Sequence, residues 1–259
     1  MTPADPLFSL AGKTALVTGG GTGIGAMIAA GFVRRGVRTY ITGRDAPRAE
    51  ERARQLSQDG TCIGLGADFS HEAGPLELAS ALARREERLD ILVNNAGTTA
   101  TGSLAEMSVA DWDLVFDVNL RAVFFLTRAL LPQLRAAASA EDPARIINIG
   151  SIGGLHVPNW EAHSYGASKA ALHHLTRSLA KALGRDGITV NAIAPGPFPS
   201  GLTDTSSEVV RNSIAAHIPL DRPGAADDVE GAAVFLASRA GAYVNGTTIP
   251  LDGGYIAAL

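Results

Sequence analysis

The sequence of 259 residues is poor in cysteine: Cys62 is the only one. A single cysteine excludes a disulfide within the chain and a metal site built from several thiolates. We therefore predict no metal centre. Cys62 lies in the apolar run TCIGLG, which indicates a buried, unreactive thiol.

Long apolar runs and an excess of positive charge are also missing. No apolar run reaches the roughly 18 residues of a membrane span, and the first residues, MTPADPLFSLAGK, lack the apolar core of a signal peptide. The formal net charge of −4 disfavours a nucleic-acid surface, which needs clustered basic side chains. We expect neither nucleic acid nor membrane as a partner, and a cytoplasmic location.

Short apolar segments alternate with segments of helical period. Hydrophobic residues make up 46% of the chain and charged residues 19%, which is typical of a globular protein. Helical periodicity is clearest in residues 24–36, 47–60 and 165–184. Seven segments rich in β-branched residues are predicted strands: KTALVTG, VRTYITG, TCIGLGAD, LDILVNNAG, ARIINIGS, GITVNAIAPG and AYVNGTTIPLDGG.

Apolar strands separated by helices predict an α/β fold with one parallel sheet. Both faces of such a sheet are covered by helices, and ligands bind beyond the carboxyl ends of its strands. We expect a single Rossmann-like, doubly wound domain over residues 1–259, serving both dinucleotide binding and catalysis. A segment rich in Pro, Gly and Ser suggests a mobile substrate flap over residues 198–218.

A glycine cluster, TGGGTGIG, connects the first predicted strand to the first predicted helix. Glycines let the backbone approach a pyrophosphate closely, and a helix amino terminus directs N–H groups at it. The order strand, cluster, helix therefore predicts a dinucleotide site. The cluster lacks the GK[ST] ending of a triphosphate-binding loop, which disfavours a phosphotransferase.

The end of the second predicted strand bears on the choice of cofactor. Gly43 and Arg44 stand where a carboxylate would select the 2′-hydroxyl of NAD, and a guanidinium can instead bind a 2′-phosphate. This favours NADP. The alternative is that Arg44 is a solvated charge while Asp45 caps the next helix. Asp68, after the third strand, could accept from the adenine amino group or cap a helix.

Six motifs together resemble the short-chain dehydrogenase/reductase family. In chain order they are TGGGTGIG, NNAG, Asn119 in DVNL, INIGS ending at Ser151, YGASK with Tyr165 and Lys169, and IAPG. They span essentially the whole chain in the order of the family. The segments APGPFPS and PLDGGY are most similar to bacterial β-ketoacyl reductases, particularly the rhamnolipid-associated type.

The resemblance implies roles for individual residues. Tyr165 would be the general acid/base, Ser151 would polarise the substrate oxygen, Lys169 would assist, and Asn119 would hold a relay water. Asn95 would lie along the adenosine and Phe198 would meet the nicotinamide carboxamide. The implied cofactor contacts are Gly19, Gly21, Thr22, Gly23, Ile24, Gly25, Arg44, Asp68, Phe69, Asn95, Ala96, Gly97, Tyr165, Lys169, Pro195, Gly196, Phe198 and Ser200.

Tyr165 and Lys169, four residues apart, would share one face of a helix. An ammonium about 4 Å from a phenol stabilises the phenolate by roughly 4 kcal/mol at an effective dielectric near 20. We therefore expect Lys169 to lower the pKa of Tyr165 by up to about 3 units, toward the range useful for general acid–base catalysis.

The chain departs from the family pattern in two places. Thr22 stands where NADP-dependent relatives often carry a basic residue, so Arg44 would bind the 2′-phosphate largely alone. Ser151 and Tyr165 are fourteen apart, one more than the commonest spacing, and we expect the extra residue to bulge above the substrate. Candidate substrate contacts are Ser151, His156, Trp160, His163 and Tyr165.

Three interpretations of function remain open at this stage. The first is an NADP-dependent reductase of a carbonyl compound, best matched to a 3-oxoacyl thioester. The second is a reductase or dehydrogenase of a sugar acid, polyol or small ketone. The third is a catalytically silent dinucleotide sensor, which the presence of Ser151, Tyr165 and Lys169 disfavours. The resemblance also implies a homotetramer and a role in fatty acid metabolism.

Overall fold

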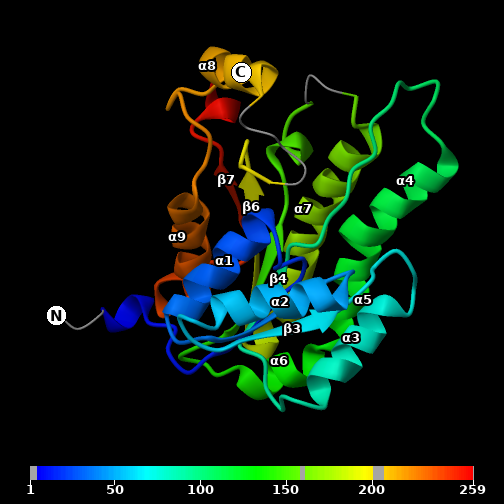
Figure 1. Ribbon diagram of the computed structural model, residues 1–259. Coiled ribbons are helices and arrows are strands. Elements are labelled where there is room, and N and C mark those ends of the chain that lie inside the picture. Colours follow the sequence, from blue (N-terminus) through cyan, green and yellow to red (C-terminus); the bar gives the residue numbers. More distant parts are fainter. Residues whose placement is uncertain (1–4, 158–160, 201–206, 259) are drawn as a thin grey trace.

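The computed structural model describes residues 5–157, 161–200 and 207–258, and it contains one seven-stranded sheet (Figure 1). All neighbouring strands are parallel, in the order β3-β2-β1-β4-β5-β6-β7. Each of the seven predicted segments contains one of them, which confirms the predicted fold class. Their bounds are β1 (Thr14–Val17), β2 (Arg38–Gly43), β3 (Cys62–Gly66), β4 (Ile91–Asn94), β5 (Ala144–Ile149), β6 (Ile188–Pro195) and β7 (Thr248–Leu251).

Helices cover both faces of the sheet, which explains why the central strands are apolar on both sides. Side chains of α1, α2 and α9 form one buried cluster with the sheet. Side chains of α3, α5, α6 and α7 form a second cluster on the other face. The helices are α1 (Gly23–Arg34), α2 (Ala46–Leu56), α3 (Gly74–Ala83), α4 (Val109–Phe116), α5 (Ala122–Ala129), α6 (Leu131–Ala137), α7 (His163–Leu183), α8 (Glu208–His217) and α9 (Ala226–Ala237).

The strand order reverses between β1 and β4, so the loops after these strands diverge to opposite faces and leave a crevice at the carboxyl edge. Figure 1 shows α8 and the carboxyl terminus at the same end of the molecule, beyond β6 and β7. Among the helices of the described residues, none is long and apolar enough to cross a membrane.

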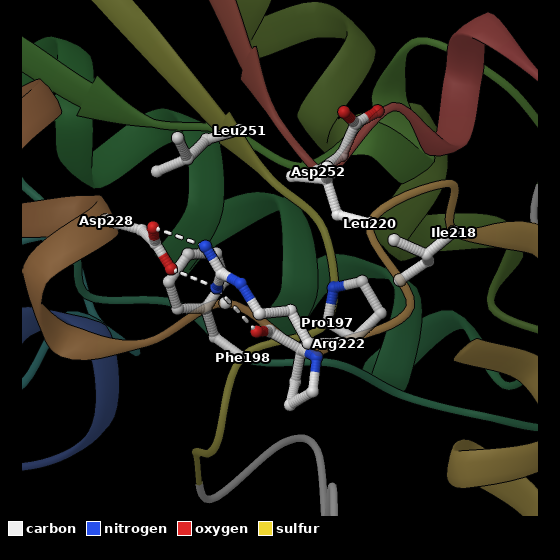
Figure 2. A pocket seen from close by; sticks show the side chains of 11 residues that line it. Pro197, Phe198, Ile218, Leu220, Arg222, Asp228, Leu251 and Asp252 are labelled. Carbon is white, nitrogen blue, oxygen red and sulfur yellow. Dashed lines mark hydrogen bonds and ion pairs between the residues drawn. The ribbon is translucent and has the colours of Figure 1, made fainter. Parts of the chain in front are cut away.

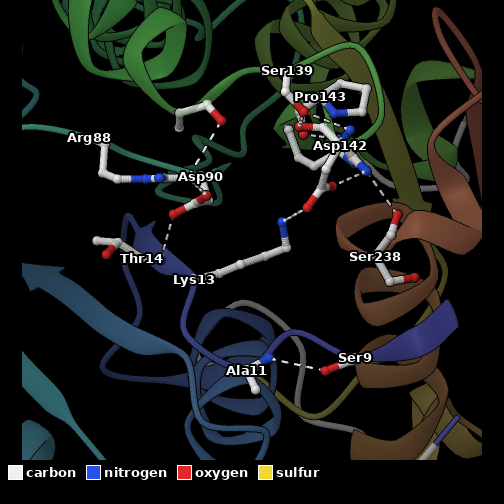
Figure 3. A network of polar contacts seen from close by, with 12 residues as sticks. Ser9, Ala11, Lys13, Thr14, Arg88, Asp90, Ser139, Asp142, Pro143 and Ser238 are labelled. Carbon is white, nitrogen blue, oxygen red and sulfur yellow. Dashed lines mark hydrogen bonds and ion pairs between the residues drawn. The ribbon is translucent and has the colours of Figure 1, made fainter. Parts of the chain in front are cut away.

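A buried polar network holds the opposite, amino-terminal edge of the sheet (Figure 3). Arg145, at the start of β5, is 1% exposed and donates to the Asp142 carboxylate and the Ser238 carbonyl, both at 3.0 Å. Burial lowers the pKa of Arg145. Asp90, just before β4, accepts from the Thr14 amide at 2.9 Å. The Arg145 amide donates to the Asp90 carbonyl at 2.8 Å, and Lys13, just before β1, pairs with Asp142. The starts of β1, β4 and β5 are thus joined away from the carboxyl edge.

Cys62 lies at the start of β3 and is 8% exposed. Burial raises the pKa of its thiol to about 11, so the reactive thiolate is scarce at neutral pH. This confirms the predicted inert thiol.

Candidate active site

The glycine loop after β1 owes its shape to three different requirements. Gly19 and Gly23 have φ of +62° and +53°, the left-handed region that favours glycine. A Cβ on Gly25 would lie 2.6 Å from the Gly19 carbonyl oxygen and would overlap the Asn95 amide. Gly21, in contrast, has no neighbouring atom within 4 Å of such a Cβ. The loop is therefore closely packed behind and open in front, which fits a pyrophosphate lying across Gly21 at the start of α1.

Gly20, Thr18 and Thr42 complete this loop, although none of them was among the predicted site residues. A Cβ on Gly20 would lie 2.7 Å from the Ile41 side chain. The Thr18 hydroxyl accepts from the amides of Asn95 and Ala96 at 2.9 and 3.0 Å. The Gly19 amide donates to the Thr42 hydroxyl at 3.2 Å. A threonine before glycine at the end of a buried strand, in VTG and ITG, was the available signal.

The Asn95 side chain serves the protein itself. Its amide nitrogen donates to the carbonyls of Thr18 and Gly19 at 2.9 and 3.2 Å. Asn95 thus joins the loop after β4 to the glycine loop. Its predicted place along the adenosine stays a prediction, and the observed bonds make it a brace for the cofactor loop.

Arg44 and Asp68 follow β2 and β3 at the same edge of the sheet. Arg44 is exposed, and Asp45 caps α2 by accepting from the Arg48 amide at 3.0 Å. Hydrogen bonds from Ser70 lower the pKa of Asp68. The positive charge of Arg44 lowers it further, but by less. The half of the prediction that made Asp68 a helix cap is wrong, because its carboxylate caps a turn that ends before α3 begins.

Of the remaining predicted cofactor contacts, Ser200 lies beside the glycine loop. Its Cβ is 3.0 Å from the position that a Cβ on Gly23 would take. The side chains of Phe69 and Phe198 are buried, at 6% and 2% exposure, so contact with a cofactor would come from their backbone. Of the other predicted contacts, Thr22, Ala96, Gly97 and Gly196 lie in loops at the carboxyl edge, Pro195 is the last residue of β6, and Ile24 lies in the first turn of α1.

A small apolar cavity lies beneath the segment after β6 (Figure 2). Phe198, Leu220 and Leu251 line it, and Arg222 donates to both carboxylate oxygens of Asp228 at its edge, at 2.6 and 2.9 Å. None of the predicted catalytic side chains lines this cavity. Its lining brings Phe198 and Ile218, at the two ends of the predicted flap, next to Asp228 of α9.

The four predicted catalytic residues come from three elements and meet at one place. Ser151 follows β5, and its hydroxyl forms a hydrogen bond with that of Tyr165 on α7. The Lys169 ammonium nitrogen is 5.7 Å from the centre of the Tyr165 ring. A Cβ on Gly97 would lie 3.3 Å from Asn119 Oδ1 and 3.6 Å from Lys169 Nζ. The fold therefore brings Asn119, Ser151, Tyr165 and Lys169 together.

Burial, rather than Lys169, dominates the acidity of Tyr165. Desolvation raises the pKa of Tyr165, and the hydrogen bond with Ser151 lowers it by less. Our expectation that Lys169 would lower this pKa is wrong, because the net shift is upward and its causes are burial and Ser151. The Lys169 ammonium donates instead to the Ile149 carbonyl at 2.8 Å. The pKa of Lys169 falls to about 8. Tyr165 is consequently a protonated phenol at neutral pH, the state that can give a proton to a substrate oxygen.

Asn119 lies in a π-helical turn, Asp117–Arg121, and is 1% exposed. Its side chain exchanges hydrogen bonds with the backbone of Thr98, at 2.8 and 2.9 Å, and donates to the Ser168 hydroxyl at 3.0 Å. Asn119 thus braces the loop after β4 against α7. Its predicted role in holding a water stays a prediction.

His173 explains the glycine that precedes Ser151. It lies one turn beyond Lys169, is 3% exposed, and fills the space that a Cβ on Gly150 would need. Burial lowers the pKa of His173 to about 4, so the ring is neutral at physiological pH. His173 is thus a core residue that also supports the loop carrying Ser151.

The predicted substrate residues are only partly described. His156 is half-buried in the loop after Ser151, and His163 is exposed at the first position of α7. Trp160 and residues 201–206 of the predicted flap lie outside the described residues. Among the described residues, no group of three or more His, Cys, Asp or Glu side chains could hold a metal ion.

Comparisons with known proteins match the chain along almost its whole length. A family model described as enoyl-(acyl carrier protein) reductase matches residues 19–256. A rhamnolipids biosynthesis 3-oxoacyl-[acyl-carrier-protein] reductase from Pseudomonas aeruginosa is 48% identical over 252 residues, covering 96% of this chain and 98% of the relative.

Two solved structures have the same fold. The Pseudomonas aeruginosa RhlG/NADP active-site complex has a TM-score of 0.94 at 47% identity, covering 97% of this chain and 99% of that one. A gluconate 5-dehydrogenase from Burkholderia cenocepacia, in complex with NADP and tartrate, has a TM-score of 0.90 at 31% identity, covering 98% and 99%.

Proposed function

Because this chain belongs to the short-chain dehydrogenase/reductase family of oxidoreductases, we propose a specific reaction for it. We propose that it is an NADP-dependent reductase of 3-oxoacyl thioesters. One observation carries the proposal. The hydroxyl groups of Ser151 and Tyr165 are hydrogen-bonded beside the buried Lys169, at the edge of the sheet that also carries the open glycine loop.

Each residue has a separate task in the reduction of a ketone. When bound, the nicotinamide supplies the hydride. Ser151 donates a hydrogen bond to the carbonyl oxygen as negative charge develops there. Tyr165, protonated because it is buried, gives its proton to that oxygen. Lys169, where it carries a proton, stabilises the resulting phenolate.

Two observations support NADP as the cofactor: the residues at the end of β2 and the NADP bound in solved relatives. Gly43 leaves no carboxylate there to repel a 2′-phosphate, and the exposed Arg44 can pair with one. The solved relatives named above are NADP complexes. We therefore propose NADPH as the preferred reductant.

Apolar side chains near the site favour an acyl chain over a sugar acid. Leu155 and Val157 follow Ser151 with exposures of 43% and 89%, and Leu220 follows α8 with 62%. Sugar-acid reduction remains the second candidate, because a gluconate 5-dehydrogenase shares the fold at 31% identity.

Two basic residues, Arg145 and Arg185, bear on the form of the thioester, and both lie at the amino-terminal edge of the sheet, opposite the predicted catalytic residues. Arg145 is buried and pairs with Asp142, so it offers no exposed charge. Asp186, beside Arg185, pairs with Arg135. This arrangement supports a coenzyme A ester at least as well as a carrier-bound one, and a role in fatty acid metabolism stays a proposal.

Turnover with NADPH tests the proposed function. Acetoacetyl-CoA should be reduced much faster than gluconate is oxidised or 5-ketogluconate reduced. Tyr165→Phe should lower kcat by about 10²- to 10⁴-fold, because it removes the proton donor, while the Kd for NADPH stays unchanged. Preference for the sugar acid would establish the second candidate, and a fully active Tyr165→Phe enzyme would remove Tyr165 from its role.

We also propose that the protein is a homotetramer. Large apolar side chains stand exposed on α4 and α5: Val109 at 78%, Leu114 at 40%, and Trp112 and Phe124 at 39% each. Burial of such a surface between subunits would remove it from water. Light scattering on the purified protein should give four times the chain mass of 26.7 kDa, and a monomer mass would reject the tetramer.

A further inference from the structure

A tyrosine near the carboxyl terminus lies between two histidines from distant segments. The Tyr255 ring centre is 5.0 Å from that of His156 and 5.8 Å from that of His217. His156 belongs to the loop after Ser151, and His217 is the last residue of α8. Tyr255 itself is 8% exposed. One buried ring therefore touches both the loop after Ser151 (the serine loop) and α8, a helix of the predicted flap.

Apolar packing around Tyr255 joins the same elements. Ile152 from the serine loop and Ile214 and Ile218 from the region of α8 form a buried cluster with Tyr255. This cluster is separate from the two that lie against the sheet. Its contacts therefore connect only the serine loop, the region of α8 and the carboxyl-terminal segment.

Polar bonds fix the segment that carries Tyr255. The Asp252 carboxylate accepts from the amides of Gly254 and Ile256 at 2.9 and 3.0 Å. The Leu220 amide, just beyond α8, donates to the Gly253 carbonyl at 3.2 Å. A Cβ on Gly253 would lie 2.7 Å from the Ile218 side chain. The turn before Tyr255 is thus held in place and closely packed against the end of α8.

We propose that Tyr255 is a positioning residue that clasps α8 to the loop after Ser151, a role that rests on the proposed reductase function. The Ser151 hydroxyl accepts from the Gly153 amide at 3.1 Å, and the His156 amide donates to the Ile152 carbonyl at 3.0 Å. A shift of His156 would therefore reach Ser151 through Ile152 and Gly153. The loop after Ser151 thereby gains an anchor at His156. Misplacement of a catalytic group by about 1 Å costs about 10²-fold in rate.

Tyr255→Leu, which keeps apolar volume but removes the ring, tests the clasp. Each aromatic contact corresponds to a factor of about 2 to 10, so kcat/KM for acetoacetyl-CoA should fall about 5- to 100-fold. The Kd for NADPH should stay unchanged, and Tyr255→Phe should restore kcat/KM. The same substitution at Tyr243, which is fully exposed, is the matched control. Equal losses at both tyrosines, or no loss at Tyr255, would overturn the clasp.

A double-mutant cycle addresses the bridging role directly. His156→Leu and His217→Leu each remove one of the two contacts of Tyr255. If the ring couples them, the double variant loses much less kcat/KM than the product of the two single losses. Losses that multiply mean that the two histidines act independently, which contradicts the clasp.

Hydrogen–deuterium exchange separates this inference from the proposed function, since it needs no substrate. In Tyr255→Leu the amides of Gly154, Leu155 and His156, which bond back within their own loop, should exchange faster, while those of β5 should not. If the wild type fails to reduce acetoacetyl-CoA but these amides respond, the substrate proposal fails and the clasp stands. Unchanged exchange at these amides refutes the clasp.

Discussion

Burial of Lys169, one of the four predicted catalytic residues, should have a measurable effect on the stability of the fold. Lys169 is 4% exposed, and its pKa falls from 10.5 to about 8 because burial disfavours the charged form. A difference of about 2.5 pH units corresponds to about 3 kcal/mol at 1.36 kcal/mol per unit. Below pH 8 both the folded and unfolded states carry the proton, so folding bears the full cost of burying the charge.

The sign of the pH dependence follows from proton counting. Between about pH 8 and 10.5 the unfolded state keeps a proton at Lys169 that the folded state has released. The free energy of unfolding therefore rises with pH across this window. Lys169→Met has no such proton, so its stability relative to wild type should be highest near pH 7 and decline by about 3 kcal/mol toward pH 10.5.

Urea unfolding followed by circular dichroism, at fixed protein concentration and at several pH values from 7 to 10.5, measures this decline. The comparison should be made in a Tyr165→Phe background, because an unfolded tyrosine titrates near pH 10 while burial raises the pKa of folded Tyr165. Loss of the bond to the Ile149 carbonyl subtracts about 1 kcal/mol, so the slope is the test rather than the absolute value. Lys181→Met, an exposed lysine on the same helix, is the control. A stability difference between the proteins with and without Lys169→Met that does not change with pH would refute the reasoning.

Two further predictions concern the cofactor half of the site. Arg44→Ala should raise the Kd for NADPH by about 10- to 100-fold, the value of a charge-assisted pair, and leave the Kd for NADH nearly unchanged. Fluorescence titration measures both constants, with Arg48→Ala as the control. Equal losses of affinity for the two cofactors would place the 2′-phosphate elsewhere. Gly25→Ala should lower the free energy of unfolding by about 1–3 kcal/mol through overpacking against the Asn95 amide, whereas Gly21→Ala, which meets open space, should not; similar unfolding curves for the two variants would contradict the packing seen around the loop.

The sheet could be predicted from sequence because its signal is local. Apolar runs such as ARIINIGS differ sharply from the helical segments around them, and a parallel arrangement follows from the alternation. The approximate place of the site follows from topology, since Gly19, Arg44, Asn119 and Ser151 all lie near the carboxyl edge. These predictions needed no side-chain coordinates.

The chemistry of individual side chains could not be read in this way. The spacing of Tyr165 and Lys169 gave their shared helix face but not the direction of the ammonium, which is set by the Ile149 carbonyl on a strand twenty residues away. Spacing also cannot show that the Asn95 amide is used by Thr18 and Gly19. Desolvation and competing hydrogen bonds depend on long-range packing, and this is why the predicted pKa of Tyr165 had the wrong direction.

The Thr18 hydroxyl couples the glycine loop to the part of the site around Gly97. Through the amides of Asn95 and Ala96 it links the glycine loop to the strand end that continues to Gly97, between Asn119 and Lys169. We therefore expect a change in the glycine loop to reach the predicted catalytic residues Asn119 and Lys169 through this strand end. Evolution toward new substrates would be expected to leave this junction intact and to vary the segments after β5 and β6, where the chain can change without disturbing either half.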